Sequence, residues 1–247
     1  MKCLILAAGY ATRLYPLTEN FPKPLLEVGG KTILDWLLDD IDSSGKINEY
    51  VVISNDKFFC HFEEWAKKKK LNAPITLVND GSRDNDSRLG AVADIKFAID
   101  SLKIEDDIIV IAGDNVLDFS LCRFIDYFQD KKEPCVMRYY EDRVEKLRKT
   151  GVASVNDEGL ITKMVEKPEN PESNWCIPPF YAYPEKDLKM LEQGIKDGCK
   201  TDAPGSFVVY LASKQKVYAM EMPGARYDIG DLKSYEEVNK EYKGITG

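Results

Sequence analysis

The sequence has almost no histidine, and its cysteines form no motif. Its 247 residues include one histidine, His61, which lies in an aromatic stretch and is expected to pack or to face solvent. A triad of serine, histidine and aspartate is therefore excluded unless it uses His61. Scattered cysteines in a chain of this length predict buried, reduced thiols rather than a disulfide framework or a zinc site. The six are Cys3, Cys60, Cys122, Cys135, Cys176 and Cys199.

Long apolar runs and an excess of positive charge are also absent. No stretch approaches the roughly 20 apolar residues of a membrane span, and the N-terminus lacks the pattern of a signal peptide. We therefore expect a cytoplasmic protein with no membrane partner. A net charge of -8 argues against a nucleic-acid partner, although an anionic nucleotide can still bind where a few cations converge. The lysines at 67–70 are expected to cap the carboxyl end of a helix.

Strand-like and helix-like segments alternate through the first half of the chain. This order predicts an α/β fold with a Rossmann-like, mostly parallel mixed sheet and helices on both faces. Such sheets bind ligands at the carboxyl ends of their strands. The expected strands are 2–7, 50–54, 75–78 and 107–112, and the expected helices are 32–41, 58–70 and 90–101.

Beyond about residue 133 the segments shorten and turns become more frequent. No Ser/Gly-rich linker and no repeat separates the two parts. We therefore expect a single domain over 1–247, with a nucleotide-binding half (1–132) and a small acceptor-binding subdomain (133–247). Its expected strands are 134–138, 151–155, 160–165 and 178–183, followed by a helix over 231–243.

The first 24 residues indicate a phosphate site. A strand-like run ends in the small residues Ala7, Ala8 and Gly9, and the cations Arg13 and Lys23 follow. Small residues let a ligand approach the backbone, and Gly9 can adopt angles that are closed to other residues. Backbone N–H groups in such a turn bind anions, which the Arg13 fork and the Lys23 point charge would also hold. The alternative is an ordinary turn with both cations solvated.

A second candidate group stands at the end of the apolar strand at 108–112. There Gly113 is followed by Asp114. A carboxylate at the end of a buried strand is costly unless it binds a metal or pairs with a cation. Mg²⁺ prefers one or two carboxylates together with phosphate oxygens, so Asp114 is a candidate Mg²⁺ ligand. A helix-capping role is the alternative.

The segment from Leu6 to Arg13, with Pro16-Leu17-Thr18 and Lys23-Pro24, resembles the signature of the sugar-phosphate nucleotidylyltransferases, or nucleoside-diphosphate-sugar pyrophosphorylases. The chain is similar to the glucose-1-phosphate thymidylyltransferases and related cytidylyltransferases of that family. The resemblance implies the family's nucleotide-diphospho-sugar transferase type of fold. One departure is Ala11, where the signature has its last glycine, and it predicts a loop conformation open to alanine.

The resemblance also implies a role for each matching residue. Glu166 would accept hydrogen bonds from sugar hydroxyls, Lys167 would contact the sugar phosphate, and Gly90 would leave room for the base. Asp228 would join Asp114 on the metal. The implied set is catalytic Arg13 and Lys23; nucleotide-binding Leu6, Ala7, Ala8, Gly9, Leu89, Gly90 and Asp114; acceptor-binding Gly151, Glu166, Lys167 and Tyr181; and metal-binding Asp114 and Asp228.

Two further departures leave the substrates open. A pyrimidine nucleotide is favoured, but the loop at 79–88 is longer and more polar than the family pattern, so the choice among CTP, dTTP and UTP stays open. Arg83 and Arg88 in this loop are expected either in solvent or on the ligand. Pro178 and Pro179 remove backbone donors that could meet sugar hydroxyls. The acceptor is therefore a sugar 1-phosphate or a smaller phosphorylated alcohol resembling phosphocholine, and the oligomeric state is left open.

The implied reaction is a Mg²⁺-dependent transfer of NMP from an NTP to the acceptor phosphate, with release of pyrophosphate. Such an in-line displacement needs no general base, which suits a chain with one histidine. Two alternatives remain. One is a glycosyltransferase that uses a nucleotide sugar, but Asn115 stands where its second acid would be expected. The other is a non-catalytic regulatory module that binds a nucleotide sugar.

Overall fold

The computed structural model describes residues 1–246, and the chain forms two compact units. The first unit comprises residues 1–88, 111–123 and those from 223 onward; the second comprises 89–110 and 124–222. Each unit thus draws on stretches that are separated in sequence. The two predicted functional halves, divided once at residue 132, stay a prediction.

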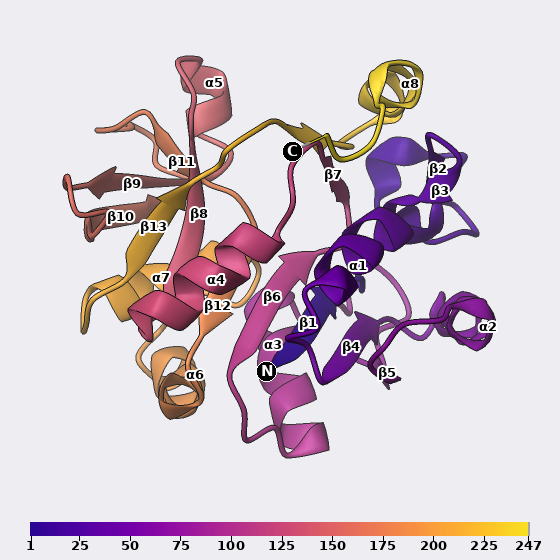
Figure 1. Cartoon of the computed structure of the whole chain (residues 1–247), viewed down its shortest axis with the longest axis horizontal. Coiled ribbons are helices and arrows are strands. Elements are labelled where there is room, and N and C mark those ends of the chain that lie inside the picture. Colours follow the sequence, from indigo (N-terminus) through magenta and orange to yellow (C-terminus); the bar gives the residue numbers. More distant parts are fainter. Residues whose placement is uncertain (247) are drawn as a thin grey trace. The chain divides into compact units, whose positions relative to one another are not determined.

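Parallel strands carry the first unit (Figure 1). β1 (Lys2–Leu6) pairs with β4 (Glu49–Ser54), which pairs with β5 (Ile75–Asn79). The central residues of β1 and β4 are buried and apolar, as expected for strands covered on both faces. β6 (Ile108–Ala112) runs from the second unit into the first, where the Gly113 N–H donates to the Leu6 carbonyl (3.1 Å).

Two helices of the first unit begin directly after a capping side chain. Thr32 precedes α1 (Ile33–Ser43) and its hydroxyl accepts from the Asp35 N–H (3.0 Å). Asp231 precedes α8 (Leu232–Glu241) and forms a capping box with Ser234. The other helical elements are η1 (Thr12–Leu14), η2 (Lys23–Leu25) and α2 (Phe59–Lys68).

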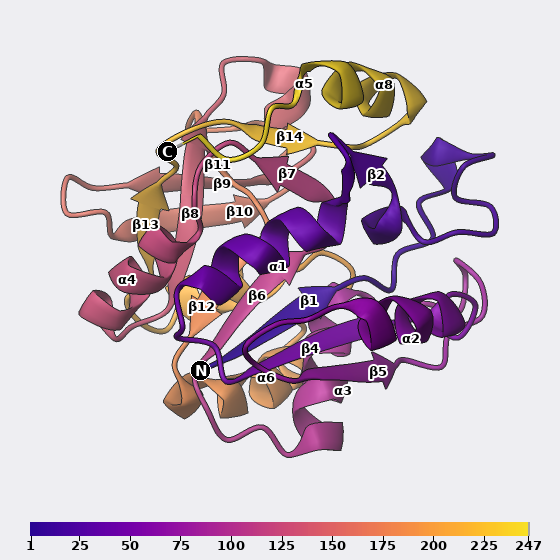
Figure 2. The ribbon, with the colours of Figure 1, turned by 45° about the vertical axis from the view of Figure 1, so that its right-hand side comes forward.

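Two short strand pairs complete the first unit (Figure 2). β7 (Asn115–Leu117) pairs antiparallel with β14 (Arg226–Asp228), which places Asp228 opposite Asn115. β2 (Glu27–Val28) pairs with β3 (Lys31–Thr32). Beside them, a core that includes Leu14, Val116 and Ile229 packs against α8. β14 and α8 are thereby packed against the rest of the unit.

The second unit is built on a mostly antiparallel sheet with helices. Its strands follow the order β10-β9-β11-β8-β12, and β13 lies parallel to β8. α7 packs on β10, and α6 contacts both α7 and α3. The predicted α/β fold with a mixed sheet is confirmed. Strands are β8 (Cys135–Tyr140), β9 (Gly151–Val155), β10 (Ile161–Glu166), β11 (Trp175–Ile177), β12 (Phe180–Tyr183) and β13 (Tyr218–Glu221); helices are α3 (Ala91–Leu102), α4 (Cys122–Lys131), α5 (Val144–Leu147), α6 (Glu185–Lys196) and α7 (Gly205–Ala212).

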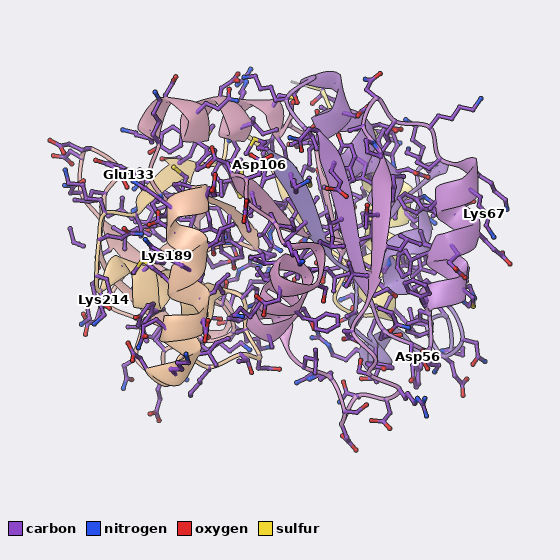
Figure 3. The ribbon with its side chains drawn as sticks, turned by 90° about the horizontal axis from the view of Figure 1, so that it is seen from below. Asp56, Lys67, Asp106, Glu133, Lys189 and Lys214 are labelled. Carbon is purple, nitrogen blue, oxygen red and sulfur yellow. The ribbon has the colours of Figure 1, made fainter. Side chains whose placement is uncertain are left out.

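The lysine run does not act as one cap. α2 ends at Lys68, and Lys67 lies on its exposed surface (Figure 3). Lys69 instead turns toward α1, where it forms ion pairs with Asp35 (2.8 Å) and Asp39. Lys67 and Lys68 lie in the last turn of α2, and Lys69 is its C-cap residue, whose N–H donates to the Trp65 carbonyl (3.0 Å), so the expected place at the helix end is confirmed for these three. The side-chain charge of Lys69, however, pairs with the two carboxylates on α1.

The cysteines are all free, as predicted. Cys3, Cys135 and Cys176 are buried, but Cys60 is exposed on α2, so the prediction of burial is wrong there. Residues 1–246 contain no helix long and apolar enough to span a membrane.

Candidate active site

The small residues after β1 form a turn held from the side of β4. The Ala7 N–H donates to the Ile53 carbonyl (2.9 Å), and the buried Asn55 amide donates to the Ala8 carbonyl (2.9 Å). Gly9 is exposed, and a Cβ added to it would meet no atom within 4 Å. The space above Gly9 is open, as close approach of a ligand to the backbone requires.

Ala11 adopts a left-handed backbone conformation, with φ 47° and ψ 42°. The expectation that alanine marks a conformation open to it is therefore wrong, and Gly9 has no positive φ. The turn holds Ala11 in place because its carbonyl accepts from the Leu14 N–H (2.9 Å) and from the buried Thr18 hydroxyl (2.8 Å). The bond from the Leu14 N–H starts η1, the turn that carries Arg13.

Lys23 and Asp114 form an ion pair at the end of β1. The Lys23 ammonium donates to Asp114 Oδ2 (2.9 Å); the lysine side chain is only 9% exposed, whereas that of Asp114 is 41% exposed. η2 begins at Lys23, and its Pro24 lies against Gly113, where an added Cβ would sit 3.3 Å from the proline ring. Gly113 therefore lets η2 approach the strand that delivers Asp114.

Two residues that the sequence analysis did not assign complete this cluster. Asn115 is fully buried, and its amide donates to Asp114 Oδ1 (2.6 Å). The side-chain oxygen of Asn115, Oδ1, accepts a hydrogen bond from Arg226 Nη1 (2.6 Å). Arg226 stands two residues before Asp228, and this sequence proximity was the one available signal. No sequence pattern shows that β7 and β14 pair.

Asp228 and Arg13 lie beside this network. The Ile229 N–H donates to the Asp114 carbonyl (3.5 Å), so Asp228 stands next to Asp114, and its side chain is 54% exposed. Arg13 is exposed, and its guanidinium lies about 4 Å from the position that a Cβ on Gly230 would take. The first unit therefore brings Arg13, Lys23, Asp114 and Asp228 together.

The electrostatics of Asp114 follow from these neighbours. Burial acts to raise its pKa, but the charge and hydrogen bond of Lys23, with the charges of Arg226 and Arg13, hold the pKa below its usual value. Asp114 is thus ionised near neutral pH, the state that a metal ligand needs.

Asp114 and Asp228 fit a magnesium site. Residues 1–246 hold no group of three or more His, Cys, Asp or Glu side chains placed to bind a metal together. The two carboxylates are partly exposed, and the hydrogen bond from the Ile229 N–H to the Asp114 carbonyl brings their backbones together after β6 and at the end of β14. Mg²⁺ is commonly held by one or two carboxylates plus phosphate oxygens, and this pair matches that donor set.

In the second unit, Glu166 closes β10 and turns toward α7. β9 places Gly151 opposite Glu166, and an added Cβ on Gly151 would lie 2.9 Å from Glu166 Oε2. A Cβ on Gly205, the first residue of α7, would lie only 2.2 Å from the same oxygen. Burial raises the pKa of Glu166, and the charge of Lys167 opposes that rise. Two glycines therefore make the room that this carboxylate occupies.

The other expected acceptor residues differ in exposure. Lys167 is exposed and has a positive φ of 49°. Tyr181 is buried, and its ring stacks with that of Tyr183. Tyr181 is thus part of the sheet's packed face, while Lys167 presents its charge to solvent.

Gly90 serves a close contact between two segments. Its φ is +94°, and an added Cβ would lie 2.7 Å from the Thr201 carbonyl oxygen. The first N–H groups of α3 are used there: that of Val92 donates to the Thr201 carbonyl (2.9 Å), and that of Ala91 to the Asp202 carbonyl (3.3 Å). Leu89 is 39% exposed. Gly90 is thus required for packing, whether or not a base also lies against it.

Part of the polar loop at 79–88 is anchored to the phosphate turn. Buried Ser82 donates through its hydroxyl to Asp80 (2.7 Å) and accepts from the Tyr10 hydroxyl (3.3 Å). Arg83 is 83% exposed and lies 3.4 Å from Asp56. The start of the loop is therefore fixed beside Tyr10, and the Arg83 side chain lies in solvent.

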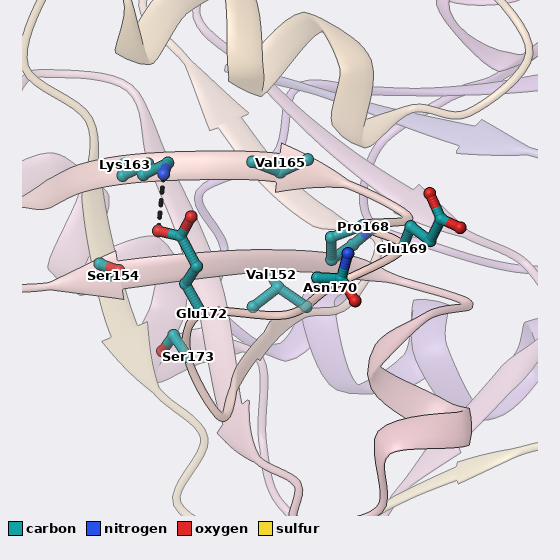
Figure 4. Close-up of a pocket in the computed structure, with 9 residues that line it drawn as sticks. All are labelled: Val152, Ser154, Lys163, Val165, Pro168, Glu169, Asn170, Glu172 and Ser173. Carbon is teal, nitrogen blue, oxygen red and sulfur yellow. Dashed lines mark hydrogen bonds and ion pairs between the residues drawn. The ribbon is translucent and has the colours of Figure 1, made fainter.

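A cavity of about 270 Å³ lies over β9 and β10 (Figure 4). Val152 and Val165, which pair across the two strands, lie on its floor, and an ion pair between Lys163 and Glu172 (2.6 Å) closes one side. Side chains alternate along a strand, so this cavity and Glu166 lie on opposite faces. The lining residues are Val152, Ser154, Lys163, Val165, Pro168, Glu169, Asn170, Glu172 and Ser173.

A model of the nucleotidyl transferase family matches residues 2–244. The chain belongs to this family. The nucleotidyl transferase is 27% identical, over 250 aligned residues, to the UTP–glucose-1-phosphate uridylyltransferase AglF of Haloferax volcanii, with 100% of this chain and 98% of that protein covered. It is 28% identical to the bifunctional protein GlmU of Methanocaldococcus jannaschii, covering 97% of this chain and 54% of that protein. The chain thus spans about half of GlmU.

Solved structures share the fold of this nucleotidyl transferase. UDP-glucose pyrophosphorylase in complex with UDP-glucose superposes with a TM-score of 0.81 at 21% identity, covering 98% of this chain and 97% of that chain. The apo structure of UDP-glucose pyrophosphorylase gives 0.80 at the same identity and coverage. The α/β architecture is therefore that of a known transferase fold.

Proposed function

We propose that this nucleotidyl transferase moves NMP from an NTP to a sugar 1-phosphate, or to a similar phosphorylated alcohol, and releases pyrophosphate. The observation that carries the proposal is the cluster of Arg13, Lys23, Asp114 and Asp228 beside the open turn at Gly9. Cations and carboxylates together suit a polyphosphate and its metal, whereas cations alone would suit any anion.

The chemistry needs one bond to form and one to break. An oxygen of the acceptor phosphate attacks the α-phosphorus of the NTP, and the bond from that phosphorus to the bridging oxygen of pyrophosphate breaks. Little proton transfer accompanies this step, so no general base is required. His61, on α2, fits that expectation, because its ring lies edge-on to the rings of Phe21 (5.3 Å between centroids) and Phe58 (6.2 Å).

The chain's own residues position the phosphates. We assign Lys23 to the α-phosphate and attacking oxygen, Arg13 to the departing pyrophosphate, and Lys167 to the acceptor phosphate. Charges fixed in advance stabilise the developing negative charge without reorganisation during the reaction. Asp114 and Asp228 would hold Mg²⁺, which when bound supplies further charge neutralisation on the phosphate oxygens.

We also propose which nucleotide base and which class of acceptor the enzyme uses. AglF, which the chain matches over its whole length, is named for UTP and glucose 1-phosphate, and this supports a pyrimidine nucleotide and a hexose phosphate. Pro178 supports a smaller acceptor instead, because β12 starts only at Phe180 and the Phe180 N–H is already used by the Pro178 carbonyl (2.8 Å). A cytoplasmic location stays a prediction.

A pyrophosphate-release screen tests the proposal. CTP, dTTP, UTP, GTP and ATP are each combined with several sugar 1-phosphates and with phosphocholine, in the presence of Mg²⁺. We expect release with one pyrimidine nucleotide and one acceptor class, and none when the acceptor is omitted. The absence of turnover with every pair would contradict the proposed reaction and favour a regulatory module that binds without catalysis.

A further inference from the structure

The two carboxylate oxygens of Asp114 accept hydrogen bonds from two different side chains. Oδ1 accepts from Asn115, which is buried and held in turn by Arg226 across the β7–β14 pair. Oδ2 accepts from Lys23, at the start of the separate turn η2. The bond at Oδ1 is thus fixed by the sheet. The bond at Oδ2 depends on a flexible four-carbon side chain.

We propose that Lys23 competes with the divalent metal for Oδ2 of Asp114, and that the triphosphate relieves this competition by offering Lys23 a second anionic partner. The inference deepens the proposed function and rests on it, because it adds a linkage between metal and nucleotide at the same site. Lys23 thereby acts as a positioning residue for the metal, in addition to its proposed contact with the phosphates.

Burial and charge explain why the exchange needs the nucleotide. The Lys23 side chain is 9% exposed, and a buried ammonium that loses its carboxylate partner without gaining another is strongly unfavourable. Arg13 and Arg226 already add positive charge around Asp114. A divalent cation alone would increase that excess, whereas metal and triphosphate together bring balancing charge. The two ligands should therefore bind with positive coupling.

Mn²⁺ binding measured without turnover tests the inference. The wild type and Lys23→Met are titrated with Mn²⁺ alone, and free Mn²⁺ is followed by electron paramagnetic resonance. We expect Lys23→Met to bind Mn²⁺ at least about tenfold more tightly, because one adjacent positive charge is removed. Its nucleotidyl transfer should fall at the same time, so the two readouts move in opposite directions. Equal or weaker Mn²⁺ binding by Lys23→Met overturns the inference.

The second part of the experiment measures the coupling between Mn²⁺ binding and triphosphate binding. An α,β-methylene triphosphate, corrected for the Mn²⁺ that it binds in solution, should raise the wild-type affinity for Mn²⁺ by a larger factor than that of Lys23→Met. Lys31→Met is the matched control, because Lys31 is exposed and pairs with Asp39 (2.9 Å) rather than with Asp114. It should behave as wild type. Asp114→Asn should abolish the tighter binding in the Lys23→Met background, and persistence of that binding would contradict the assignment of Asp114 as the metal ligand for which Lys23 competes.

A second variant covers the case in which Lys23→Met does not fold. If Lys23→Met does not fold, judged by circular dichroism, Lys23→Gln and the wild-type coupling replace it, and a wild type without coupling overturns the inference. Failure of the proposed function has a different signature. If no NTP and acceptor release pyrophosphate but Lys23→Met still binds Mn²⁺ more tightly, the competition stands and the proposed reaction fails.

Discussion

At the scale of single residues, Lys23 is a proposed catalytic residue whose charge is buried. Its ammonium is sheltered from water, so its interactions are weakly screened, and the ion pair with Asp114 holds it at the site before substrate arrives. Prolines on both sides restrict the backbone that carries it. Once the triphosphate is bound, a charge on such a restricted backbone can contribute to the transition state without further reorganisation.

Replacing Lys23 by alanine should therefore lower the rate of transfer by roughly 100-fold or more, the scale of losing one preorganised charge. The measurement is single-turnover pyrophosphate release with the substrate pair that the screen identifies. Lys31→Ala, which removes an exposed lysine of the same unit, should retain normal rates. A Lys23→Ala enzyme with near-wild-type release would remove Lys23 from the catalytic set.

Ala11 offers a prediction about stability. Its left-handed conformation is unfavourable for any residue with a Cβ, by about 1–2 kcal/mol, whereas glycine adopts it freely but loses more entropy on folding. Ala11→Gly should raise the free energy of unfolding by about 0.5–1 kcal/mol. Ala66→Gly, within α2, should lower it by about 1 kcal/mol. Urea denaturation decides the sign, and a destabilised Ala11→Gly would contradict the argument.

The same position shows where sequence reasoning stops. The motifs point to Arg13 and Lys23 as cations that follow a turn of small residues, and to Asp114 because a carboxylate at the end of an apolar strand is costly unless it meets a metal or an opposite charge. The left-handed conformation of Ala11 cannot be predicted from such a motif. It is held by hydrogen bonds such as the one from the Thr18 hydroxyl, and no local sequence pattern shows which residues these bonds join. The sequence shows Asn115 only as a missing acid, yet this residue fixes Asp114.

At the scale of elements, the start of α7 determines where the Glu166 carboxylate lies. Gly205→Ala would place a methyl group 2.2 Å from the present position of Glu166 Oε2, so the carboxylate must move. We expect the KM for the acceptor to rise at least about tenfold, the scale of losing one hydrogen-bonded contact, with the KM for the NTP unchanged. Ser213→Ala, at the other end of α7, is the control. A rise confined to the NTP would exclude Glu166 from the acceptor site.

The turn into α5 gives a pH-dependent prediction. Glu141 is buried and accepts from the Arg143 guanidinium (2.7 and 2.8 Å) and from its N–H (3.1 Å). The hydrogen bonds of Arg143 lower the pKa of Glu141 to about 2. A lowered folded-state pKa contributes stability above the unfolded value of about 4.3, and this is lost as pH falls toward 2.

Glu141→Gln should thus lower the free energy of unfolding at pH 7 by about 1–2 kcal/mol, a range reduced because the Arg143 side chain is half exposed. The difference from wild type should shrink as the pH is lowered from 5 to 3. Chemical denaturation across that range measures it. A constant difference would mean that the loss comes from packing and not from the charge.

The sequence predicts those helices and strands whose apolar pattern is long enough to show a period, and it misses very short strands and the effect of prolines on a strand's first residue. The face of α1 and the strands β1, β4 and β9 follow from apolar spacing, so the sequence predicts them within a residue or two. β7 and β14 have three residues each, too few for a period to show. β12 begins two residues later than expected because Pro178 and Pro179 lack N–H groups for the ladder.

At the scale of the whole molecule, folding and metal binding should be separable. Both carboxylate oxygens of Asp114 already accept hydrogen bonds from the protein, so folding does not require a metal ion to neutralise this side chain. EDTA should therefore abolish transfer while the far-ultraviolet circular dichroism stays the same and the midpoint of thermal unfolding shifts by less than about 2 °C. Restored Mg²⁺ should restore the rate. Unfolding by EDTA would show a structural metal.

The interleaving of the two units has a consequence for biosynthesis. Asp228, Arg226 and α8 belong to the first unit, although they are synthesised after the whole of the second. A ribosome that has released the chain only as far as residue 222 has therefore delivered Arg13, Lys23 and Asp114 but not the strand that anchors Asn115. The phosphate site is incomplete until β14 has been synthesised, so a nascent chain of this protein should remain inactive until then.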